Sequence, residues 1–85
     1  MKQQAAKPWA EEPGYQRLWH FLLAMRLFQM QKQLDRCYAE ADQSGFEQFR
    51  KDFIWWMNPN DPEGRYWIQF IHEYQFKAQK QLSLF

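Results

Sequence analysis

A long, uninterrupted helical pattern is the feature that most constrains how this chain can fold. Residues 15–43 contain neither glycine nor proline, and their apolar residues recur at the spacing that places them on one face of a helix. The residues on that face are Tyr15, Trp19, Leu22, Leu23, Met30, Leu34, Cys37 and Ala41. We therefore expect a single long helix over residues 15–43.

Capping signals indicate two further helices. The segment Ser44-Gly45-Phe46-Glu47 combines capping-box spacing with a glycine that permits a chain reversal, which predicts a second helix over residues 46–57. The segment Asp61-Pro62-Glu63 supplies a cap, a proline at the first helical position and an acidic first turn, which predicts a third helix over residues 62–80. Because no segment alternates as a strand does, the expected fold class is all-α, a small three-helix domain spanning residues 15–80.

The N-terminal region is expected to behave differently from the helices. Residues 1–14 are polar and are interrupted by Pro8, Pro13 and Gly14, a pattern typical of a flexible arm. Trp9 is expected to hold this arm against an apolar surface of the domain, since a large aromatic ring among polar residues gains most by burial.

Length and charge limit the class of protein. A chain of 85 residues forms one domain at most, and a net charge of +1 gives no electrostatic case for an acidic partner. Cys37 is the one cysteine, so it has no internal disulfide partner. No apolar run has the length of a membrane span, and the first residues lack the apolar core of a signal peptide. The expected localisation is cytoplasmic, with no membrane association.

Aromatic residues are unusually abundant. Five tryptophans, four tyrosines and eight phenylalanines make up 20% of the chain, and a domain this small has too little interior to bury all of these rings. Phe21 and Phe28 lie off the main face of the first predicted helix, and Trp55 lies off that of the second. We expect these three residues to form an interface, in a homodimer or with a stable protein partner.

The sequence offers little for catalysis. His20 and His72 have no cysteine, histidine or carboxylate at the spacing of a metal site. Cys37 has no histidine at local spacing, which favours a buried thiol over a nucleophile. The scattered glycines form no phosphate-binding loop. We therefore predict no enzyme activity, no catalytic residues, no metal and no cofactor.

Binding of single-stranded nucleic acid is a weaker interpretation. Basic residues interleaved with aromatic rings can stack bases, and the candidates are Arg50, Lys51, Trp55, Arg65, Lys77 and Lys80. Acidic residues lie among them, namely Glu47, Asp52, Glu63 and Glu73. A solvated face of mixed charge is the favoured interpretation, and direct nucleic-acid binding stays an alternative.

The five residues from 81 to 85 carry the most specific functional signal. The sequence Gln81-Leu82-Ser83-Leu84-Phe85 resembles the linear motif by which bacterial replication and repair proteins dock on the DNA polymerase sliding clamp, whose preferred form is Gln-Leu-(Ser or Asp)-Leu-Phe. All five positions match. The glutamine amide can donate and accept hydrogen bonds, while the leucines and phenylalanine suit an apolar groove.

This resemblance implies a function but covers only residues 81–85. It implies a small adaptor or regulator that docks on the clamp in DNA replication, repair or translesion synthesis, encoded by a bacterium or by a plasmid or phage. Two alternatives stay open. The tail could pack on its own domain, leaving a helical protein–protein interaction subunit, or the protein could be an accessory that binds single-stranded nucleic acid.

Overall fold

The computed structural model describes residues 8–76, and it confirms the all-α fold class. A short 3-10 helix, η1 (Pro8–Glu11), precedes four α-helices, which are α1 (Pro13–Ala24), α2 (Phe28–Ala39), α3 (Gln43–Trp56) and α4 (Pro62–Glu73). Residues 8–76 contain no strand. Within the same residues, no helix combines the length and apolarity needed to cross a bilayer.

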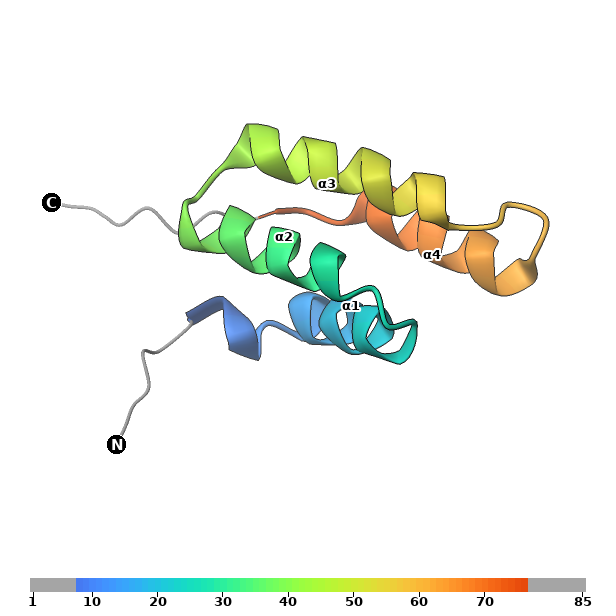
Figure 1. The fold of residues 1–85 in the computed structure, drawn as a ribbon, viewed down its shortest axis with the longest axis horizontal. Helices are drawn as coiled ribbons and strands as arrows, with labels where there is room; N and C mark the ends of the chain where they lie inside the picture. Colours follow the sequence, from blue (N-terminus) through green and yellow to red (C-terminus); the bar gives the residue numbers. More distant parts are fainter. Residues whose placement is uncertain (1–7, 77–85) are drawn as a thin grey trace, which may run out of the picture.

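The four helices run in alternating directions, as Figure 1 shows. α2 packs on α1 and on α3, and α3 packs on α4. This alternation places the α1–α2 turn and the α3–α4 connection at one end of the bundle, and the α2–α3 turn at the other (Figure 1). Short connections between antiparallel neighbours are typical of a helical bundle.

α3 supplies the centre of the hydrophobic core. Phe46, Phe49 and Phe53 recur at helical spacing and are fully buried, so they form the inward face of this helix. They are joined by Leu18, Leu22, Leu34 and Ile71 from the other three helices, which are also fully buried. Full burial of one such side chain stabilises the fold by roughly 1.5 to 3 kcal/mol, so α3 is the element on which the other helices assemble.

The prediction of one helix over residues 15–43 is wrong, because the chain breaks into α1 and α2 at residues 25–27. The amide of Leu27 donates to the Leu22 carbonyl at 2.9 Å, and the Arg26 amide donates to that of Leu23 at 3.0 Å. Arg26 has a φ of 61°. This is a Schellman motif, which ends a helix through one left-handed residue. Glycine usually holds that position, so its absence concealed the break.

The α2–α3 turn uses the same device. Asp42 N–H donates to the Cys37 carbonyl at 2.9 Å and Ala41 N–H to that of Tyr38 at 3.2 Å, while Ala41 has a φ of 50°. The reversal therefore occurs at Ala41, and the prediction that Gly45 makes it is wrong. The three-helix count is wrong for the same reason as above, since four α-helices fill residues 8–76.

The predicted bounds of the last two helices also need correction. α3 begins at Gln43 rather than at residue 46, because the Asp42 carboxylate accepts a hydrogen bond from Gly45 N–H at 2.9 Å and caps the helix. α4 begins at Pro62 as predicted but ends at Glu73, and Tyr74 is extended with a ψ of 127°. The prediction of helix is therefore wrong for residues 74–76, and residues 77–80 lie outside the described part.

The flexible arm predicted for residues 1–14 lies only partly within the described residues. Residues 8–14 fold as η1 and the start of α1, so that prediction is wrong for them, while residues 1–7 lie outside the described residues. The Trp9 ring stacks on Tyr38 with centroids 5.7 Å apart and planes 17° apart. This contact confirms the expected role of Trp9 in holding the N-terminal segment against the domain.

Candidate interaction surfaces

The segment that leads from α4 toward the predicted docking motif is fixed to the core. Phe76 is buried and stacks on Phe46, with centroids 4.7 Å apart and planes 12° apart. Tyr38 meets the same Phe76 ring edge-on at 4.7 Å. The packed core thus extends to Phe76. The motif residues Gln81, Leu82, Ser83, Leu84 and Phe85 lie outside the described residues.

Arg50 of α3 also fixes the segment that follows α4. Its guanidinium donates to the carbonyl oxygens of Ile71 and Tyr74, the latter at 3.1 Å, and lies 5.0 Å from the centroid of the Phe46 ring. The guanidinium also pairs with Glu47 at 3.1 Å. A cation at a helix C-terminus satisfies carbonyls that have no partner within the helix. Arg50, a candidate for nucleic-acid contacts, is therefore engaged inside the domain.

The three residues predicted to form an interface have different environments. Phe21 is half-buried and stacks on Trp67, with centroids 4.1 Å apart and planes 19° apart, so the domain itself uses much of this ring. Phe28 is 51% exposed and Trp55 is 77% exposed. Whether any of the three contacts a partner stays a prediction.

Trp56 and Met25 are exposed apolar residues that sequence reasoning did not assign to a surface. Trp56 is 54% exposed and Met25 is 51% exposed. Both side chains line a small pocket of about 120 Å³. The adjacent pair Trp55-Trp56 was an available signal, because two bulky neighbours that differ by about 100° around a helix seldom both fit the apolar face of a small domain.

The pocket beside Met25 and Trp56 is apolar at its base and acidic at its rim. Its floor is made of Phe21, Met57 and Trp67, while Asp61 and Glu63 contribute carboxylates. Asp61 and Glu63 are exposed, and Met57 and Trp67 are buried. The pocket suits an apolar side chain next to a positive charge.

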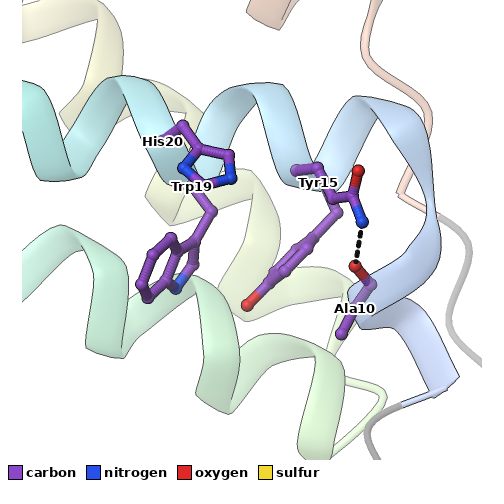
Figure 2. A pocket seen from close by; sticks show the side chains of 5 residues that line it. Ala10, Tyr15, Trp19 and His20 are labelled. Carbon is purple, nitrogen blue, oxygen red and sulfur yellow. Dashed lines mark hydrogen bonds between the residues drawn. The ribbon is translucent and has the colours of Figure 1, made fainter.

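A second pocket, shown in Figure 2, lies between η1 and α1. It has a volume of about 270 Å³ and is lined by Ala10, Tyr15, Gln16, Trp19 and His20. Figure 2 shows Tyr15 and Trp19 pointing from α1 toward α2, where the Tyr15 hydroxyl donates to the Asp35 carboxylate. Gln16 spans the pocket mouth by donating to the Ala10 carbonyl at 3.0 Å.

The chemistry of this second pocket does not indicate catalysis. Burial first, and then the hydrogen bond to the Asp35 carboxylate, raise the pKa of Tyr15 well above its usual value, so the hydroxyl stays protonated. The neighbour of His20 is the edge of the Trp19 ring at 5.7 Å. A protonated phenol and an imidazole against an indole do not make an activated nucleophile.

Two further tyrosines form a hydrogen-bonded pair, in which Tyr38 is buried and Tyr74 is half-buried. The hydroxyls of Tyr38 and Tyr74 are 2.8 Å apart, and either can be the donor. Burial raises the pKa of both phenols, and for Tyr38 the hydrogen bond to Tyr74 adds to this. Burial likewise raises the pKa of the Cys37 thiol. A buried thiol with a raised pKa is unreactive, in keeping with the structural role expected for Cys37.

The candidate metal-binding residues do not come together. Among residues 8–76, no group of three or more histidine, cysteine, aspartate or glutamate side chains could hold a metal ion. His20 lies in α1 and His72 in the last turn of α4.

Comparison of the chain with protein-family models, with curated proteins and with solved structures found no match in any of the three.

Proposed function

We propose that this protein is a small non-catalytic adaptor or regulator that docks on a bacterial DNA polymerase sliding clamp through Gln81–Phe85. By resemblance, its setting is DNA replication, repair or translesion synthesis. The observation that carries the proposal is the match of all five motif positions in the sequence. A linear motif needs no fold of its own, because the partner groove supplies the geometry.

The position of the motif relative to the core supports this proposal. Phe76 is the last described residue and is buried, and Arg50 fixes the chain at Tyr74. Residues 77–80 therefore separate the anchored segment from Gln81. Those residues and the step to Gln81 can span about 17 Å at most. This spacing in the sequence allows the motif to enter a partner groove without displacing Phe76 from the core.

The expected affinity follows from the motif residues. Burying Leu84 and Phe85 contributes roughly 1.5 to 3 kcal/mol each before ordering costs, and Gln81 adds hydrogen bonds worth about 1 kcal/mol. These contributions, with a smaller one from Leu82, bound the free energy of binding at about 8 kcal/mol, so the dissociation constant is micromolar at the tightest once the cost of ordering the segment is subtracted. Such an interaction is a reversible tether.

Titration of a purified bacterial sliding clamp with the full chain tests the proposal. The wild type should bind with micromolar affinity, Gln81→Ala should weaken binding about threefold to tenfold, and Leu84→Ala with Phe85→Ala should abolish it. Ser83→Asp is a matched control, because the preferred motif accepts either residue there, and it should still bind. Binding that survives the Leu84 and Phe85 changes would refute the proposal.

A parallel measurement distinguishes the alternatives. The Leu84→Ala and Phe85→Ala variant should melt at the wild-type temperature, whereas a large drop would favour a tail packed on the domain. Titration with a single-stranded oligonucleotide tests the nucleic-acid alternative, since such binding falls steeply with salt. Engagement of Arg50 with backbone carbonyls makes that alternative the weaker one.

A further inference from the structure

One end of the bundle carries most of the exposed apolar side chains. Met25, Phe28, Trp55 and Trp56 are each at least half exposed, and we refer to these four residues as the end patch. Met25 lies in the α1–α2 turn, Phe28 begins α2, and the two tryptophans end α3. Figure 1 places the α1–α2 turn and the end of α3 at the same end of the molecule.

Contacts between α2 and α3 bring the members of the end patch together. Gln33 of α2 donates to the Asp52 carboxylate of α3 at 3.2 Å. Trp56 lies one helical turn beyond Asp52 on the same face of α3, toward the end of the bundle at which antiparallel α2 begins with Phe28. Trp56 also shares a pocket with Met25, and its ring meets that of Trp55 at 5.4 Å.

Charges beside the end patch are divided by sign. The acidic residues Asp61 and Glu63 line the pocket of Met25 and Trp56. Arg26 is exposed and directly follows Met25 in the α1–α2 turn. Its φ of 61° and the Schellman hydrogen bonds fix the backbone of that turn. Around this pocket the surface thus presents an apolar centre with Arg26 on its α1–α2 side and the acidic residues Asp61 and Glu63 on its α3–α4 side, where the exposed Arg65 follows in the first turn of α4.

A surface with this distribution is complementary to itself. In a two-fold dimer the same patch of both copies forms the interface. Any contact from one residue of the first copy to another residue of the second copy therefore occurs twice. The pocket suits an apolar side chain next to a cation, and Met25 followed by Arg26 is such a pair within this chain. From this complementarity we propose that the end patch is the interface of a homodimer, in which Arg26 of each copy faces Asp61 and Glu63 of the other.

This arrangement brings exposed apolar surface and charge together in one contact. The indole rings of Trp55 and Trp56 supply the large apolar area typical of interface centres. The carboxylates and the guanidinium fix the orientation, because a wrongly rotated copy places like charges together. The proposal does not depend on clamp docking, although a dimer would carry two copies of the Gln81–Phe85 motif.

Sedimentation equilibrium of the full chain, combined with charge reversal, tests the proposal. The wild-type mass should rise with concentration from 10.6 kDa toward twice that value. Arg26→Glu and Glu63→Arg should each raise the dimer dissociation constant about tenfold, because a two-fold interface contains every pair twice. The double variant Arg26→Glu with Glu63→Arg should return it to within about threefold of the wild type.

Two further variants control for folding and for charge alone. Arg36→Glu changes the same charge in the last turn of α2, at the opposite end of the bundle, and should leave the dissociation constant unchanged. Trp56→Ala should abolish the dimer while circular dichroism shows the wild-type helix content. A wild type that stays at 10.6 kDa at all concentrations, or a double variant that dimerises no better than the single ones, would overturn the proposal.

Discussion

Gly64, in the first turn of α4, packs directly against the backbone of Asn58. A Cβ atom at position 64 would lie 2.8 Å from the Asn58 carbonyl carbon and closer still to its oxygen. Asn58 belongs to the α3–α4 connection, which is tied by the Asp61 N–H donating to the Asn58 carbonyl at 3.1 Å. Because backbone atoms cannot rotate away as a side chain can, a Cβ atom at position 64 would force the start of α4 and this connection to shift.

We therefore expect Gly64→Ala to destabilise the domain by about 2 to 3 kcal/mol, the range for overpacking a tight site. For a domain of this size, the melting temperature should fall by about 10 °C or more. Thermal denaturation followed by circular dichroism measures the change. Arg65→Ala is the matched control, since Arg65 is exposed in the same turn, and its effect should stay within about 0.5 kcal/mol. Equal melting temperatures for the two variants would contradict the packing described.

Ala41→Gly should have the opposite sign. Ala41 adopts a φ of 50° in the α2–α3 turn, where an alanine Cβ is strained and glycine is not. Relief of this strain exceeds the entropy that glycine loses on folding, so the free energy of unfolding should rise by about 0.5 to 1 kcal/mol.

Ala39→Gly provides the comparison for Ala41→Gly. Ala39 is exposed and is the last residue of α2, so glycine there should reduce the free energy of unfolding by about 0.5 to 1 kcal/mol. Urea unfolding of both variants measures the difference. If both substitutions destabilise to the same extent, the reversal does not occur at Ala41.

The α1–α2 and α2–α3 turns also explain which features of the fold could be predicted from the sequence. The helical class, the core phenylalanines of α3 and the start of α4 at Pro62 follow from periodicity and capping, and all are present. The breaks at Arg26 and Ala41 could not be predicted from residue type, because non-glycine residues adopt the left-handed conformation there. Hydrogen bonds to the preceding turn and tertiary packing outweigh local preference at these positions.

The end of α4 and the candidate surfaces show the same limit. Apolar periodicity continues past Glu73, but the helix ends there, where the Arg50 guanidinium of α3 donates hydrogen bonds to the carbonyl oxygens of Ile71 and Tyr74. Arg50 lies far from Ile71 and Tyr74 in the sequence, so no local sequence pattern indicates that α4 ends at this point. Trp55 was predicted to lie off the main face of its helix and is exposed, while Trp56 is exposed as well and lines a pocket with Met25.

Arg50→Met should loosen the segment that follows α4. The change keeps an unbranched apolar stem but removes the guanidinium donors to Ile71 and Tyr74, and losing hydrogen bonds to a charged group costs about 2 kcal/mol. The lost pair with Glu47 lies at the surface on the Glu47 side, where that side chain is 49% exposed, so it adds little.

Urea unfolding and amide hydrogen exchange measure the effect of Arg50→Met. We expect a lower unfolding midpoint and faster exchange at residues 74–76. Lys51→Met is the control, because Lys51 is the exposed neighbour on α3, and its effect should stay within about 0.5 kcal/mol. Unchanged exchange in Arg50→Met would show that Phe76 packing alone holds the segment.

Alkaline pH should unfold the domain through its buried tyrosines. Burial raises the pKa of Tyr15, Tyr38 and Tyr74 above the value of about 10 that a tyrosine has in an unfolded chain. Above that pH the unfolded state loses phenol protons that the folded state retains, so the free energy of unfolding keeps its full value below about pH 10 and falls as the pH rises further.

Urea midpoints measured from neutral to alkaline pH, with tyrosinate absorbance as a second probe, should show this fall. Tyr38→Phe removes one of the three phenols and should make the decline shallower, whereas Tyr66→Phe, at an exposed ring, should leave it unchanged. A stability that is flat through alkaline pH would mean that these phenols ionise freely in the folded protein.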